Sequence, residues 1–114
     1  MEDCIFCKII NGDIPSKKVF ENQNVYAFYD INPQAKIHVI IVPKTHIESA
    51  NEITTNNSDK VKEVFESIPQ IADVLGVKQD GYRIITNIGK NAGQTVKHIH
   101  FHLIAGEFLG EKLV

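Results

Sequence analysis

The sequence predicts an α+β fold whose sheet is mainly antiparallel. Short runs of β-branched and aromatic residues recur between turn residues, and one central segment has the three- and four-residue apolar spacing of an amphipathic helix. The length of 114 residues suits one domain, which we expect to cover residues 1–114.

The expected strands are short and rich in β-branched residues. They lie at residues 18–21, 25–29, 38–42, 82–87 and 96–104. The polar turn Asn22-Gln23-Asn24 makes the first two an antiparallel hairpin. Pro43 closes the third strand.

Two helices are expected between these strands. The long one covers residues 58–75, and its apolar side chains share one face: Val61, Val64, Phe65, Ile68, Ile71, Ala72 and Leu75. Ser58 suits its N-cap and Gly76 its C-terminal stop. Pro69 should kink or split it, because proline removes a hydrogen bond and crowds the preceding turn. A shorter helical turn is expected at residues 7–10.

The composition excludes several classes of partner. A net charge of -2 supplies no basic field for a polyanion, so we expect no nucleic acid, although a small nucleotide is compatible. The N-terminus lacks the regions of a signal peptide, and no apolar run approaches the roughly 20 residues of a membrane span. We therefore expect no membrane association and a cytoplasmic location. There, Cys4 and Cys7 are expected as thiols or metal ligands rather than as a structural disulfide.

Three of the five histidines alternate at residues 98, 100 and 102. In a strand, alternate side chains share a face, so these histidines should point one way while Ile99 and Phe101 point into the core. One interpretation is a surface strand, and a second is a metal site. An unbent strand separates His98 from His102 by roughly 13 Å, so one ion cannot bind all three histidines.

A third interpretation is phosphate chemistry. A neutral imidazole can attack phosphorus while its neighbours bind or protonate the groups around it, because an ordinary pKa near 6.5 keeps both protonation states available. A loop of small residues precedes the histidines and can bring backbone N–H groups and a hydroxyl close to a phosphate. It contains Gly89, Gly93, Gln94, Thr95 and Val96.

Residues 98–104, His-Ile-His-Phe-His-Leu-Ile, resemble the His-x-His-x-His-x-x signature, with apolar x, of the histidine triad (HIT) superfamily. Four further segments resemble its Hint branch of nucleoside phosphoramidases: "CIFCKIINGDIPSKKVFE", "AFYDINPQA", "HVIIVPKTHI" and "NAGQTV". The resemblance runs from Cys4 to about Gly106. It implies a HIT-like fold with a five-stranded antiparallel sheet, one long and one short helix, and a homodimer whose sheets join.

The resemblance also implies a reaction. His100 would attack the α-phosphorus of a purine nucleoside phosphoramidate, expel the amine and form a nucleotidyl-histidine that water hydrolyses to the nucleoside monophosphate. His102 would contact the phosphate and help protonate the amine. Thr95 matches a family serine at this place and retains its hydroxyl. His38 matches a histidine that extends the relay, although a core histidine is an equal alternative.

The same resemblance implies a nucleotide pocket. Asp30 would accept hydrogen bonds from the ribose hydroxyls, although the bare sequence favours a solvated turn residue. The base would lie among Phe6, Ile14, Phe28, Tyr29 and Ile31, with Asn87, Gly93, Gln94, Thr95 and Val96 on the phosphate side. Relatives with a C-terminal tryptophan use it to shape amine preference, and this chain has no Trp.

Cys4, Cys7 and His46 are expected at a zinc site. Many bacterial Hint-like proteins bind zinc through these three positions and the first triad histidine, here His98. Two sulfurs and two imidazoles make a closed, structural site, so the reaction itself needs no cofactor. The alternative is two buried thiols and a surface histidine.

Three other functions remain open on the sequence. The same pocket would serve a nucleotide-binding regulator or scaffold whose turnover is incidental. Dinucleotide polyphosphate hydrolases carry a similar triad. A catalytic metalloenzyme would use the alternating histidines directly.

Overall fold

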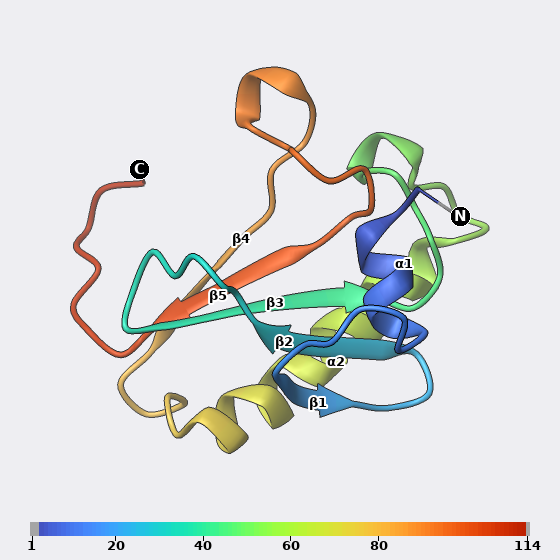
Figure 1. The fold of residues 1–114 in the computed structure, drawn as a ribbon. Coiled ribbons are helices and arrows are strands. Elements are labelled where there is room, and N and C mark those ends of the chain that lie inside the picture. Colours follow the sequence, from blue (N-terminus) through green and yellow to red (C-terminus); the bar gives the residue numbers. More distant parts are fainter. Residues whose placement is uncertain (1–2, 114) are drawn as a thin grey trace.

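The computed structural model describes residues 3–113, which form a five-stranded antiparallel sheet and two helices (Figure 1). The elements are α1 (Ile5–Ile10), β1 (Lys18–Glu21), β2 (Val25–Tyr29), β3 (Ile37–Pro43), α2 (Ser58–Leu75), β4 (Tyr82–Ile85) and β5 (Phe101–Ala105), with the short 3-10 helices η1 (Ala50–Glu52) and η2 (Lys90–Ala92). The strand order is β1-β2-β3-β5-β4. The predicted α+β class and five-stranded sheet are confirmed.

The helices cover opposite faces of the sheet (Figure 1). On one face α2 packs against Val39, Ile41 and Leu103 in the larger core cluster. On the other face α1 packs Phe6 and Ile9 against a smaller cluster that includes Phe28, Ile40 and Val42. Because β3 is covered on both sides, its sequence is apolar at nearly every position. Within residues 3–113, no helix is long and apolar enough to cross a membrane.

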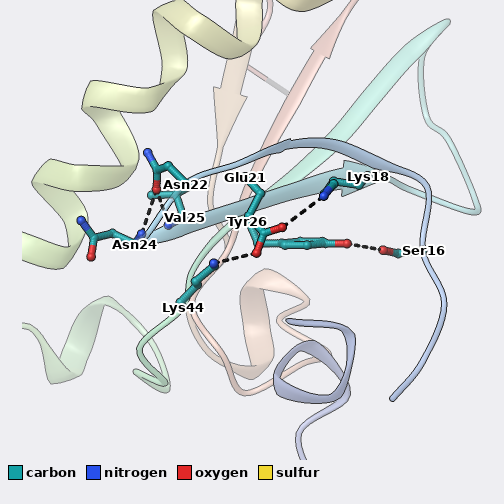
Figure 2. A network of polar contacts seen from close by, with 8 residues as sticks. All are labelled: Ser16, Lys18, Glu21, Asn22, Asn24, Val25, Tyr26 and Lys44. Atoms are coloured by element: carbon teal, nitrogen blue, oxygen red, sulfur yellow. Dashed lines mark hydrogen bonds and ion pairs between the residues drawn. The ribbon is translucent and has the colours of Figure 1, made fainter. Parts of the chain in front are cut away.

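The predicted hairpin is held by side chains at its turn (Figure 2). Asn22 Oδ1 accepts the backbone N–H groups of Asn24 and Val25, each at 2.8 Å. Hydrogen bonds from Lys44 and Lys18 lower the pKa of Glu21 in the preceding strand. The same view shows the Ser16 hydroxyl meeting that of Tyr26.

Helix α2 differs from its predicted form at its N-cap, and it is not split at Pro69. Ser58 is its first residue, so the predicted cap is wrong by one position. Asn57 is the N-cap, and its Oδ1 accepts the N–H of Thr54 at 2.7 Å instead of capping the helix. The helix also runs unbroken through the exposed Pro69. The predicted stop is confirmed, since Gly76 has φ 73° and its N–H donates to the carbonyls of Ala72 and Asp73.

The last two predicted strands are too long. β4 ends at Ile85, because Thr86 turns its hydroxyl to donate to the His100 carbonyl at 2.7 Å. β5 begins only at Phe101, because residues 96–100 leave the ladder and the Ile99 N–H donates to the Ile47 carbonyl at 2.6 Å. The short helix starts at Ile5, two residues earlier than predicted.

Replacing the helical proline should stabilise the protein. Pro69→Ala restores an N–H that can donate to the Phe65 carbonyl. Proline also stabilises a protein by restricting its unfolded chain, but the cost of proline inside a helix is larger. We therefore expect the free energy of unfolding to rise by about 2 kcal/mol. Urea denaturation measures the change. Gln70→Ala, at the neighbouring exposed position, should shift stability by less than about 0.5 kcal/mol. An unchanged midpoint for Pro69→Ala would contradict the expectation.

Candidate active site

The three alternating histidines lie on the α1 side of the sheet, as their spacing predicts. Ile99, Phe101 and Leu103 enter the core beneath α2. His98 is completely buried and His100 is only 6% exposed, while His102 is half-buried. The alternation holds although His98 and His100 precede the paired part of the strand.

His100 is held with one ring nitrogen free to act as a nucleophile. Its Nδ1 lies 2.8 Å from the His98 carbonyl oxygen, which can only accept, so Nδ1 carries the proton. The lone pair therefore lies on Nε2. Burial lowers the pKa of His100, which keeps the imidazole neutral at neutral pH. The Phe6 ring packs edge-on to it, with centroids 4.9 Å apart.

A chain of hydrogen bonds also fixes the protons of His38 and His102. The Gln34 N–H donates to His38 Nδ1 at 2.9 Å, so the proton of a neutral His38 lies on Nε2. That nitrogen is 2.9 Å from His102 Nδ1, which must accept. His102 therefore presents an Nε2–H at the open end of the chain. Burial lowers the pKa of His102, and the neighbouring His100 and His38 act in the same direction.

Asp30 joins this chain from the end of β2. Its Oδ2 is 3.4 Å from His38 Nε2, while Oδ1 accepts the Asn32 N–H at 2.7 Å. These three side chains lie close enough to suggest a metal site. The hydrogen-bond pattern disfavours one, because His38 Nε2 must keep its proton while Nδ1 accepts from Gln34. This removes the main support for a catalytic metal at these histidines.

A second cluster contains Cys4, Cys7, His46 and His98, whose ligand atoms all lie within 4.8 Å of one another. His98 Nδ1 is 3.3 Å from Cys4 Sγ, 3.6 Å from Cys7 Sγ and 3.2 Å from His46 Nδ1. Cys7 Sγ is 3.4 Å from His46 Nδ1. The four predicted ligands therefore meet at one point and could hold a metal ion.

Local hydrogen bonds orient the ligand atoms of this cluster. Cys4 is the N-cap of α1, and its Sγ accepts the Cys7 N–H at 3.3 Å, so one helical turn sets both sulfurs on one side. His98 Nε2 donates to the Pro43 carbonyl at 2.9 Å, which leaves the lone pair of Nδ1 for the cluster. Burial lowers the pKa of His98 to about 4. The pKa of the Cys7 thiol is raised to about 11, mainly by burial and next by its hydrogen bond with Cys4.

An apolar cavity of about 870 Å³ lies beside the histidines. Its size is that of a small-molecule site. It gathers six residues predicted to bind the nucleotide: Phe6, Ile14, Phe28, Tyr29, Asp30 and Ile31. The triad histidines do not line it, but two lining residues adjoin them: Ile40 pairs with His102 across the sheet, and Phe6 packs against His100.

The predicted phosphate-side residues do not line this cavity. Gln94 instead fastens its own loop, because its amide accepts the Gly89 N–H and donates to the carbonyls of Glu48 and Val96 at 2.7 and 3.0 Å. Thr95 and Val96 border a smaller hollow of about 440 Å³ beside the Cys/His cluster. Gly93 is exposed with φ 80°, and Asn87 is half-buried just beyond β4.

Sequence reasoning missed three contributors. The Gln34 backbone N–H donates to His38, and the Thr86 hydroxyl donates to the backbone carbonyl of His100; no residue pattern reveals contacts of this kind. Ser16 lines the cavity and pairs with Tyr26. Its position in the irregular segment between α1 and β1 gives no periodic signal.

The fold and the arrangement of imidazoles define a histidine triad protein. A family model described as a HIT domain matches residues 11–109, and the chain belongs to this family. It is 44% identical over 103 residues to a HIT-like protein of Helicobacter pylori, covering 90% of this chain and 96% of that one. It is 39% identical over 112 residues to the purine nucleoside phosphoramidase of Escherichia coli K12, covering 98% and 94%.

Solved structures support the same family assignment. A HIT family hydrolase from Clostridium thermocellum superimposes with a TM-score of 0.97 at 43% identity, covering 100% of this chain and 99% of that one. The chain is a hydrolase of the HIT domain family.

The proton positions can be observed directly. In long-range ¹H–¹⁵N spectra at neutral pH we expect His100 protonated on Nδ1 and His38, His98 and His102 protonated on Nε2. Backbone partners fix the proton in the first, second and third of these rings, and the His38 ring fixes it in His102. A proton on Nδ1 of His38 would contradict the chain of hydrogen bonds and reopen the metal interpretation of its neighbours.

Proposed function

We propose that this protein is a purine nucleoside phosphoramidase that cleaves the P–N bond of its substrate through a nucleotidyl-His100 intermediate. The observation that carries the proposal is the hydrogen-bond pattern. It leaves a bare Nε2 on His100 and an Nε2–H on His102, side by side with ring centroids 5.1 Å apart, at the end of an apolar cavity. The 39% identity to a purine nucleoside phosphoramidase supports it.

The reaction divides into two displacements. In the first, the His100 Nε2 lone pair forms a bond to phosphorus, the P–N bond breaks, and the leaving nitrogen takes the electron pair and one proton. His102 delivers this proton from Nε2–H as an imidazolium, after taking a second proton from solvent when the anionic substrate binds, because a neutral imidazole cannot give up its only N–H. In the second, water attacks phosphorus, the P–Nε2 bond breaks, and the neutral His102 left by the first step takes the proton released by water.

The proposed nucleotide lies along the cavity. Its base packs among Phe6, Ile14, Phe28 and Ile31, with Tyr29 at the rim. Asp30 accepts from the ribose through Oδ2, since Oδ1 is committed to Asn32. The phosphate meets His100 and His102, with contacts proposed from the loop that contains Asn87, Gly93, Gln94, Thr95 and Val96. Because Gln94 uses its amide within the loop, we assign it the role of holding Thr95 and Val96 in place.

We further propose that Cys4, Cys7, His46 and His98 bind zinc. Zn–N bonds near 2.0–2.1 Å and Zn–S bonds near 2.3 Å put tetrahedral ligand atoms roughly 3.3–3.8 Å apart. The four S···N and N···N distances of 3.2–3.6 Å suit such a site. Zinc bound there would stabilise the thiolates and fix the N-terminal helix to the triad, with no part in the chemical steps.

The proposed assembly is a homodimer joined through the sheets. Within residues 3–113, β4 pairs only with β5 and is an edge strand, so it has backbone groups available for a second chain. We also propose that residues 1–114 form one HIT domain. The family model matches residues 11–109, and α1 lies just before that range. The free Cys4 and Cys7 support residence in the cytoplasm.

The reaction can be tested on the purified protein. We expect steady-state hydrolysis of an adenosine 5′-phosphoramidate, and a loss of about 10⁴-fold or more in His100→Ala, because the nucleophile is removed. Rapid quenching and mass spectrometry should find the nucleotidyl adduct on His100 in the wild type. Binding of adenosine monophosphate shows that the variant pocket is intact. Binding without turnover in the wild type would replace the enzyme with a nucleotide-binding regulator.

Zinc should stabilise the folded state. Ion well above its dissociation constant is expected to raise the melting temperature by about 10 °C or more, because it binds only the assembled cluster. Cys7→Ser should lose most of this shift, while His102→Ala should keep it. Equal shifts in both variants would show that the ion binds elsewhere.

A further inference from the structure

The wall of the large cavity includes the hydroxyl of Ser16, which Tyr26 contacts from outside the wall. Ser16 lines the cavity, and its Oγ lies 2.8 Å from the hydroxyl of Tyr26 (Figure 2). Most of the remaining wall is apolar. Hydroxyl groups in a largely apolar wall are the kind of group that orients a ligand and selects among related ones.

The sheet puts this pair at about one nucleotide's length from the triad. His102 pairs with Ile40, Ile40 with Phe28, and Phe28 with Lys18, so β1 is three strand spacings, roughly 14 Å, from β5. Ser16 lies just before β1, where the Lys17 carbonyl accepts the Tyr29 N–H at 3.0 Å. A nucleotide with its phosphate at the histidines would point its base toward Ser16.

Tyr26 fixes the position of the Ser16 hydroxyl. The Tyr26 ring is only 8% exposed and packs against Phe28 with centroids 5.9 Å apart, so its hydroxyl cannot move away. Ser16 is exposed to the cavity side. Either hydroxyl of the pair can be the donor. When Ser16 donates to Tyr26 its oxygen can accept from a ligand, and when Tyr26 donates to Ser16 the Ser16 O–H can donate to a ligand.

We propose that the Ser16 hydroxyl, held by Tyr26, recognises the exocyclic group on the six-membered ring of the purine. This inference rests on the proposed function, because it takes a purine nucleotide as the occupant. Adenine offers an amino donor at this position and guanine a carbonyl acceptor. Because the pair can reverse its direction, Ser16 accepts from the first and donates to the second. The site therefore binds both purines and favours them over a purine that lacks the group.

Calorimetric titration tests this with three ligands: adenosine monophosphate, guanosine monophosphate and purine riboside 5′-monophosphate, which lacks the exocyclic group. The wild type should bind the first two about 3- to 10-fold more tightly than the third, the value of one hydrogen bond. Ser16→Ala should bind all three with the affinity of the third. Ser16→Thr, which keeps the hydroxyl, should retain the preference.

Two further variants control the result. Ser58→Ala, an exposed serine at the start of α2 on the other face of the sheet, should behave as the wild type. Tyr26→Phe should reduce the preference, since Ser16 loses its partner. A full preference in Ser16→Ala, or one that disappears only in Lys17→Met, overturns the inference while the proposed function stands. If none of the ligands binds the wild type, the proposed function fails and the inference fails with it.

Discussion

The hydrogen bond from His100 Nδ1 to the His98 carbonyl is the constraint on which the site depends. This hydrogen bond requires the His98 carbonyl to stay in place, and the contacts of the His98 side chain hold it there. This side chain is fully buried, bonded through Nε2 to the Pro43 carbonyl and in contact through Nδ1 with both cysteines. The next residue, Ile99, bonds to Ile47. The Cys/His cluster and the nucleophile are thus joined by one peptide unit, and each histidine is restricted to one tautomer.

The polar groups in and around the cavity fall into two sets. Asp30, His38 and His102 form one connected chain, while Ser16, just before β1, pairs with Tyr26 of β2. Only Asp30 and Ser16 of these five line the cavity, whose wall is otherwise mostly apolar side chains from α1 and the central strands. Binding energy can then come from burial of the base, and orientation from the polar groups at the two ends.

Much of this could be predicted from the sequence, because it depends on periodicity. The alternation of His100 and His102 with Phe101 and Leu103 fixed their faces, and the helical spacing fixed the inner face of α2. The resemblance to the HIT superfamily indicated which distant residues would meet, and the Cys/His cluster did assemble as predicted.

The errors have local causes. Residues 96–100 contain strand-forming side chains, yet they leave the ladder where the backbone contacts Ile47. Ser58 is a good capping residue, but the preceding turn uses Asn57 as the N-cap. Gln34 donates to the His38 ring through its own backbone N–H, and the Thr86 hydroxyl donates to the His100 carbonyl; such contacts depend on tertiary structure. Pattern alone therefore could not predict them.

The Gln94 amide has a consequence for the kinetics of ligand exchange. It fastens three backbone positions, at Gly89, Glu48 and Val96, so the loop before the triad is tied to itself and to a segment 46 residues away in sequence. A loop held in this way must break three hydrogen bonds before it can move, and it does not line the large cavity. A ligand in that cavity can therefore leave without displacing the loop, so its residence time depends on its contacts with the cavity wall and not on the opening of the loop.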